Sequence, residues 1–487
     1  MASVNLKDPR LFRQQGYING QWRDADSNET IDVHNPADGS ILATVPKMGA
    51  EETREALEAA ETAQVAWRRM LAKERSVILR RWFDLMLENQ EDLAVLMTLE
   101  QGKPLAEARG EIGYSASFLE WFADEARRIS GETIPQHQAD KRIVVIKQPV
   151  GVCVAITPWN FPSAMITRKV GPALAAGCAV VVKPATQTPL SAFALCELAE
   201  RAGVPPGVLS VVTGASGAIG AEMTSNPIVR HLSFTGSTEV GRLLMRQCSE
   251  SIIKVALELG GNAPFIVFDD ADVDAAVEGA MISKYRNAGQ TCVCSNRIYV
   301  QDGIYDAFAE KLAKEVSRMK VGAGMEDGVV QGPLIDMNAV EKVEEHIHDA
   351  VGKGARIVVG GGRHELGGTF FEPTLLTNVT SNMVVVREET FGPLAPLLRF
   401  KEEKEVIEMA NDTEFGLASY FYSRDLARVW RVSEELEYGM VGINTGLIST
   451  EVAPFGGIKQ SGLGREGSSH GIEEYLEMKY LCMGGIQ

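Results

Sequence analysis

Two neighbouring cysteines, Cys292 and Cys294 in the string GQTCVC, are the side chains best suited to covalent chemistry. A cysteine thiolate is a strong nucleophile, and the preceding glycine allows the backbone to bend and present it. A free cysteine is also a common core residue, so Cys292 taken alone favours a structural thiol. The motifs around it must decide between a nucleophile and a core residue.

A glutamate and an asparagine offer the groups that a cysteine nucleophile needs beside it. Glu258 in LELGGNAP stands between two leucines, where apolar surroundings raise a carboxyl pKa and suit a general base. Asn160 in ITPWNFP lies between prolines that stiffen the backbone, and its amide can donate to a developing oxyanion. The structural alternatives are an ion-paired glutamate at a strand end and an asparagine that caps the next helix.

Three segments have the character of phosphate or ribose sites. HLSFTGSTEVG (231–241) reads as a strand, a Gly-Ser turn and a helix start, whose free amides attract an anion. It lacks the middle glycine of the usual dinucleotide fingerprint, and VVTGASGAIG (211–220) is a competing loop. Lys183 in VVKPATQTP follows a buried strand, where open α/β sheets bind ligands. Each of these is alternatively an ordinary turn or a solvated lysine.

The elements that must position these residues are predicted from hydrophobic periodicity. Residues 50–130 carry apolar side chains three and four apart, which predicts helices. From residue 142, short apolar runs alternate with helical segments, which indicates a parallel sheet with crossover helices. A second alternation runs from about residue 262 to 400. We therefore predict the α/β class, with two parallel-sheet domains joined near 258–262 and a small added β element.

Composition excludes several classes of function. The 487 residues are 45% hydrophobic and 23% charged, which is typical of a globular protein of two or three domains. The net charge of -17 argues against nucleic-acid binding, and no apolar run is long enough for a membrane span. The start does not resemble a targeting signal, and seven scattered cysteines predict a reduced, cytoplasmic setting. No metal site is predicted, because His346 and His348 are expected on a solvated helix face.

Seven strings, in order along essentially the whole chain, resemble the aldehyde dehydrogenase superfamily. They are PWNFP, KPATQTP, FTGSTEVG, LELGGNAP, NAGQTC, EETFGP and PFGGIKQSGLGREG. The resemblance implies that Cys292 is the nucleophile, that Asn160 and the Cys292 backbone amide hold the oxyanion, and that Glu258 activates the hydrolytic water. It also implies an aldehyde dehydrogenase-like fold with three parts. These are a Rossmann-like dinucleotide-binding domain (1–129 and 148–258), a catalytic domain (259–462) and an oligomerisation element (130–147 and 463–487).

The same resemblance implies a nicotinamide cofactor and the residues that hold it. Members that prefer NAD often carry a glutamate where this chain has Thr186. A neutral hydroxyl there does not repel a 2′-phosphate, so we predict a preference for NADP, with NAD possible. The implied cofactor-binding residues are Trp159, Asn160, Lys183, Pro184, Ala185, Thr186, Gly236, Ser237, Leu259 and Glu389.

Within the superfamily the chain resembles the succinate-semialdehyde dehydrogenases, through the strings around Arg168, Arg286 and Ser449. There, two arginines and a serine hold the distal carboxylate of the substrate, which guanidinium groups suit. The alternatives are a dehydrogenase for glutarate semialdehyde or another carboxylated aldehyde, an acylating enzyme that uses coenzyme A, and a non-catalytic relative.

The resemblance and the second cysteine lead to two further expectations. The superfamily usually forms homodimers or homotetramers, and the added β element offers a sheet edge for such an assembly. Cys294 is either a small loop residue or a partner that captures oxidised Cys292 in a labile disulfide. Peroxide inactivation that a reducing agent fails to reverse would contradict the second role of Cys294.

Overall fold

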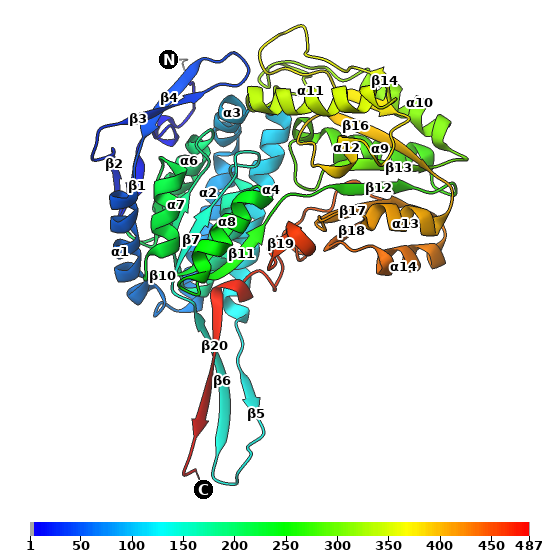
Figure 1. Cartoon of the computed structure of the whole chain (residues 1–487). Coiled ribbons are helices and arrows are strands. Elements are labelled where there is room, and N and C mark those ends of the chain that lie inside the picture. The colour runs from blue at the N-terminus through cyan, green and yellow to red at the C-terminus, as the bar shows by residue number, and fades with distance from the viewer. Residues whose placement is uncertain (1–3, 487) are drawn as a thin grey trace.

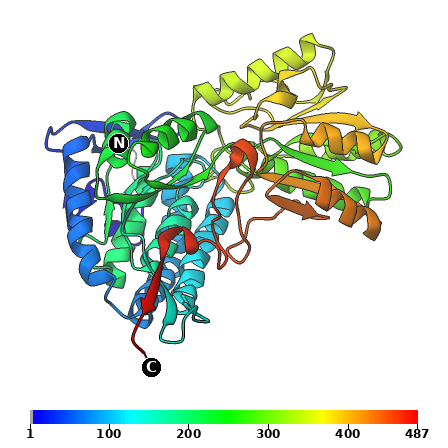
Figure 2. The ribbon, with the colours of Figure 1, turned by 60° about the horizontal axis from the view of Figure 1, so that its bottom comes forward.

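The computed structural model describes residues 4–486, which form two lobes and a projecting arm (Figure 1). The two lobes stand side by side, each built on its own sheet. The C-terminal end lies at the tip of the arm, away from the second lobe in both views (Figure 1, Figure 2). No helix within residues 4–486 is long and apolar enough to cross a membrane.

The first lobe is built on an eight-stranded sheet of order β19-β11-β10-β7-β8-β9-β1-β2. The five central strands, from β11 to β9, are parallel, whereas β19, β1 and β2 at the edges are antiparallel. The strands are β1 (Gly16–Ile18), β2 (Gln21–Arg23), β7 (Val152–Ile156), β8 (Ala179–Lys183), β9 (Leu209–Val211), β10 (Val229–Thr235), β11 (Lys254–Glu258) and β19 (Gly462–Leu463).

Helices cover both faces of this sheet (Figure 1). One face carries α1 (Ala50–Trp67), α7 (Ser216–Ser225) and α8 (Thr238–Ser249). The other carries α5 (Ala164–Ala176) and α6 (Pro189–Ala202), with α2 (Ala72–Glu88), α3 (Gln90–Gln101) and α4 (Leu105–Glu125) packed behind them. The predicted helical stretch 50–130 is therefore confirmed as α1 to α4.

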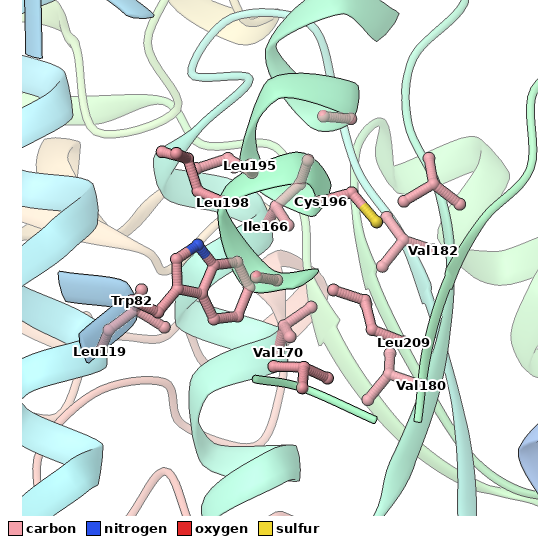
Figure 3. Packing of buried hydrophobic residues seen from close by; sticks show 14 of the residues in the cluster. Trp82, Leu119, Ile166, Val170, Val180, Val182, Leu195, Cys196, Leu198 and Leu209 are labelled. Atoms are coloured by element: carbon pink, nitrogen blue, oxygen red, sulfur yellow. The ribbon is translucent and has the colours of Figure 1, made fainter. Parts of the chain in front are cut away.

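The core of the first lobe explains why α5 lies where it does. All thirteen residues of α5 are buried, because the helix lies between the sheet and α4. Figure 3 shows Ile166 and Val170 of α5 between Trp82 and Leu119 on one side and strand residues such as Val180 on the other. Full burial of an apolar helix provides a large hydrophobic contribution to folding. It also places the two charged residues of α5, Arg168 and Lys169, inside the protein.

The second lobe has a seven-stranded sheet of order β14-β15-β16-β13-β12-β17-β18, parallel except for β14. Its strands are β12 (Ala263–Val267), β13 (Ser295–Gln301), β14 (Arg356–Val359), β15 (Thr374–Thr377), β16 (Leu394–Phe400), β17 (Ala418–Tyr422) and β18 (Met440–Ile443). Its helices are α9 (Val273–Tyr285), α10 (Tyr305–Val316), α11 (Met337–Gly352), α12 (Val384–Arg387), α13 (Glu403–Asn411) and α14 (Leu426–Glu435).

The arm is an antiparallel sheet in which β6 (Arg142–Pro149) lies between β5 (Glu132–Ile134) and β20 (Leu476–Met483). A separate hairpin, β3 (Thr30–His34) with β4 (Ile41–Pro46), packs near the N-terminus. The α/β class with two sheet-based lobes is confirmed. The antiparallel edge strands and the strands β17 and β18 were not predicted, and the exact domain boundaries remain a proposal.

Candidate active site

The predicted site residues gather where parallel strands of the first sheet end. The strand register pairs Ile156 with both Phe234 and Lys183, and it pairs Thr235 with Glu258. The carboxyl ends of parallel strands share one edge of a sheet, and ligands bind outside that edge in open α/β folds. The PWNFP segment, Lys183, the Gly-Ser turn and Glu258 therefore meet at this edge.

Cys292 comes from the other lobe and lies in the wall between two cavities of about 290 Å³ each. It is half-buried, in the loop between α9 and β13. Two consecutive residues of this loop are left-handed, Asn287 (φ 53°) and Ala288 (φ 55°). Non-glycine residues rarely adopt this region, so the surrounding structure must hold the loop. Burial raises the pKa of Cys292 to about 12, so the resting side chain is a thiol.

The first cavity, here the turn cavity, lies along the Gly-Ser turn. Six predicted cofactor residues line it: Trp159, Asn160, Gly236, Ser237, Leu259 and Glu389. The Ser237 hydroxyl accepts from the Val240 amide and so begins α8, whose remaining free amides face an anion site. A Cβ on Gly236 would lie 2.3 Å from the Phe234 ring, so any other residue there would have to displace that ring.

Glu258 is buried at the same edge and has the character of a general base. Burial raises its pKa well above the usual value, and the neighbouring carboxylate of Glu466 adds to the shift. Arg168 and Lys169 oppose it. The Oε2 atom of Glu258 has no hydrogen-bond partner among the described residues, which leaves it free for a ligand or water. The ion-paired strand-end alternative for Glu258 is therefore wrong.

Asn160 is held by the cysteine loop through its backbone and its side chain. Its side-chain Nδ2 donates to the Gln290 carbonyl at 3.0 Å, beside the cysteine loop. Its own carbonyl accepts from Asn287 Nδ2 at 2.9 Å. The helix-capping alternative for Asn160 is wrong, because Glu111 accepts the first amides of α5, those of Ser163 and Ala164.

The second cavity, here the arginine cavity, brings together the three predicted substrate residues Arg168, Arg286 and Ser449. Arg168 is 1% exposed, and its guanidinium stacks on the Phe455 ring at 4.0 Å. Its Nε lies 2.5 Å from Glu466 Oε2, so one edge of the guanidinium already has a carboxylate partner. Sequence reasoning missed Glu466, whose position within SGLGREG gives no signal of burial.

Lys183 and Thr186, three residues apart in the sequence, have different surroundings in the structure. Lys183 is buried, and its Nζ donates to Ser216 Oγ at 2.8 Å, at the start of α7. The competing glycine-rich loop 211–220 therefore belongs to the same region as Lys183. Thr186 instead lines a different cavity of about 610 Å³, beside Gln187. Pro184 and Ala185 are the buried link between Lys183 and Thr186.

The second cysteine, Cys294, does not line either cavity beside Cys292. Cys294 is fully buried, and its thiol donates to the Lys284 carbonyl at 3.3 Å. A disulfide with Cys292 must break that contact, so the redox role stays a prediction.

His346 is fully buried on the inner face of α11, and its Nδ1 atom lies 2.7 Å from Thr390 Oγ1. The expected solvated helix face is therefore wrong for this histidine. Residues 4–486 contain no cluster of three or more metal-ligating side chains.

A two-lobed α/β fold, with a half-buried cysteine and a buried glutamate beside a helix N-terminus that suits a dinucleotide, defines an NAD(P)-dependent oxidoreductase. The chain belongs to the aldehyde dehydrogenase family, whose model matches residues 22–481.

Relatives with related activities are similar over almost the full length. Glutarate-semialdehyde dehydrogenase of Pseudomonas aeruginosa is 72% identical, over 99% of this chain and 100% of the relative. The NADP-type succinate-semialdehyde dehydrogenase of Escherichia coli is 69% identical with the same two coverages. The crystal structure of an E. coli NADP-dependent enzyme, also 69% identical, superimposes with a TM-score of 0.98 over 99% of this chain and 100% of that chain.

Proposed function

We propose that this enzyme oxidises succinate semialdehyde to succinate with NADP. The observation that carries the proposal is the position of Cys292, between a cavity with two arginines and a cavity that suits a dinucleotide. Glutarate semialdehyde is the second candidate, because the relative at 72% identity is named for it. One methylene is worth only about 1–3 kcal/mol in discrimination, so we expect activity on both.

The residues present fit a nicotinamide dinucleotide. The N-terminus of α8 offers amides for the pyrophosphate, and Lys183 and Glu389 offer groups for the two riboses. The Thr235 hydroxyl is buried at the turn cavity without a hydrogen-bond partner in residues 4–486. Burial raises the pKa of Glu389 to about 7, and Oε1 accepts from the Gly261 amide at 2.9 Å. When bound there, NAD(P) supplies the acceptor for a hydride from the carbon attached to Cys292.

The protein groups divide the reaction between them. The Cys292 thiol gives its proton to water as its sulfur bonds to the aldehyde carbon, which gives a thiohemiacetal oxyanion. Asn160 and the Cys292 backbone amide donate to that oxygen, and loss of one such donor typically costs about 2.7–4 kcal/mol. After hydride loss leaves a thioester, Glu258 takes a proton from water. The water oxygen then displaces the sulfur, and the carboxylic acid leaves.

The substrate assignment is tested with Arg286→Met. A charge-assisted hydrogen bond contributes about 1.5–3 kcal/mol, so kcat/KM for succinate semialdehyde should fall about tenfold to a hundredfold. Propanal has no carboxylate, so its kcat/KM should stay within about twofold. Arg318→Met is the matched control, because Arg318 lies just after the end of α10 with 61% side-chain exposure. Equal losses on both aldehydes would contradict a carboxylate site at Arg286.

The cofactor preference is expected to depend on pH. Burial lowers the pKa of Lys183 to about 8, so the free enzyme loses this charge as the pH rises past about 8. The ratio of kcat/KM for NADP over NAD should therefore fall above pH 8. Thr186→Glu should lower the same ratio at neutral pH, and Gln187→Glu, which adds the same charge one residue away, should not. A ratio unchanged by both pH and Thr186→Glu would contradict the roles of Lys183 and Thr186 in the preference for NADP.

A homodimer or homotetramer is proposed from the arm. All three residues of β5 are exposed, and Met478 and Tyr480 of β20 are 72% and 58% exposed. Unpaired sheet edges with apolar side chains favour pairing with a second chain. Light scattering should give a mass of at least two chains, and Met478→Lys should lower it. A monomer at micromolar concentration would contradict the proposal.

A further inference from the structure

Lys103 is a buried cation that the reaction described above does not use. It lies between α3 and α4 and is 2% exposed. Its Nζ donates to Glu111 Oε2 at 2.5 Å and to the backbone carbonyl of Asn160 at 2.8 Å. It also lies 4.1 Å from the centre of the Phe161 ring. Burying a lysine costs folding free energy unless its donors have partners. A role in the site would explain why the charge is kept there.

The partner carboxylate connects Lys103 to the start of α5. Glu111 Oε1 accepts from the amides of Ser163 at 3.0 Å and Ala164 at 3.2 Å. Lys103 therefore contacts both the Asn160 carbonyl and the side chain that fixes the residues just after Asn160. The segment 160–164 is attached to α4 through the Lys103–Glu111 ion pair and through hydrogen bonds to Glu111 and Ser115.

The other side of Asn160 is attached to the cysteine loop. Asn287 Nδ2 donates to the Asn160 carbonyl and, at 3.2 Å, to the Gln290 carbonyl, which also accepts the Asn160 side chain. The Asn160 carbonyl thus lies between Lys103 and Asn287. Moving it would turn the Asn160 side-chain amide, which lines the turn cavity together with Cys292.

The backbone at Lys103 is itself fixed. The Lys103 amide donates to Gln101 Oε1 at 3.0 Å, and the Leu105 amide donates to the Gly324 carbonyl at 2.9 Å. A Cβ on Gly324 would lie only 2.4 Å from the Lys103 carbonyl oxygen. The backbone that carries the Lys103 side chain is therefore held by hydrogen bonds and by close packing against Gly324.

We propose that Lys103 is a positioning residue that holds the Asn160 backbone, so that the Asn160 amide meets the oxyanion formed at Cys292. The inference rests on the proposed oxyanion role of Asn160. The alternative is that Lys103 only neutralises the buried charge of Glu111.

A double-mutant cycle separates these two roles. Lys103→Met removes the donor and leaves Glu111 unpaired, so both stability and kcat should fall. In Lys103→Met/Glu111→Gln neither side chain is charged, so the melting temperature should recover, and this variant is testable even if the single variant does not fold. We expect kcat of the double variant to remain about 10- to 100-fold low, because misplaced catalytic groups cost that much. KM for NADP should change by less than about twofold.

Two further variants make the test specific. Arg75→Met removes another buried cation, whose Nε donates to the Ala175 carbonyl at 3.2 Å, and should lower the melting temperature without lowering kcat. In an Asn160→Ala background, the Lys103→Met/Glu111→Gln pair should cause no further loss of kcat. A double variant with full stability and full kcat would overturn the positioning role while leaving the oxyanion role intact. An Asn160→Ala enzyme with normal kcat would instead overturn the oxyanion role, and the inference with it.

Discussion

Replacing Cys292 with alanine is expected to reduce aldehyde oxidation by about four orders of magnitude or more. The variant has no sulfur to bond to the aldehyde carbon, and loss of a covalent nucleophile typically has an effect of this size. Because Cys292 is only one wall residue of the turn cavity, the affinity for NADP should stay within about threefold. Rates are measured as formation of reduced nucleotide, and affinity by calorimetry.

The neighbouring cysteine provides a matched control for this variant. Cys294→Ala removes a thiol two residues away that is fully buried and directed to the Lys284 carbonyl. It should retain kcat within about threefold. If Cys294→Ala were as inactive as Cys292→Ala, or if Cys292→Ala retained a tenth of the activity, Cys292 would not be the nucleophile.

Glu258→Gln is expected to complete the first half of the reaction and then stop. Without a base to activate water, the thioester accumulates, and turnover should fall about 10²- to 10⁴-fold. Rapid mixing should show one equivalent of reduced nucleotide per active site, followed by a slow phase. Mass spectrometry should find the acyl group on the chain. A variant with no burst would place Glu258 before the thioester instead.

The pH dependence of turnover follows from the same carboxyl group. Its pKa is raised by burial and by Glu466, so at lower pH it holds a proton and cannot act as a base. Turnover of the wild-type enzyme should therefore rise with pH as Glu258 ionises, and Glu258→Gln should lose that rise. Glu100→Gln is the control, because Glu100 is a fully buried carboxyl with a pKa raised to about 8 that lies at another cavity.

The catalytic candidates were predictable because each is tied to a local signal. Glu258 and Lys183 end strands, and Asn160 comes four residues after one, so placing the strands placed these residues at one sheet edge. The glycine-rich bend drew attention to Cys292, and the resemblance of the seven strings made it the predicted nucleophile. None of these inferences required knowledge of contacts between segments far apart in the sequence.

The residues that support the site were not predictable in the same way. Glu466 pairs with Arg168 and Lys169 across 297 residues or more, and Lys103 reaches Asn160 across 57. In the sequence, a charged residue in a helix or loop is indistinguishable from a solvated one, and only the tertiary fold shows that it is buried. The same reason explains the error for His346, which is buried although the residues around it in the sequence are mostly charged.

The left-handed residues Asn287 and Ala288 tie the shape of the site to the contact between the two lobes. Each costs about 1–2 kcal/mol by itself, so an isolated 286–292 segment would relax to another shape. The Asn287 amide is bonded to Glu107 of α4 at 2.9 Å, and the Asn287 side chain to Asn160, and both partners belong to the other lobe. The native shape of the loop therefore depends on contact between the two lobes. In a chain whose lobes are apart, Cys292 would stand on a loop without these supports, as an ordinary thiol.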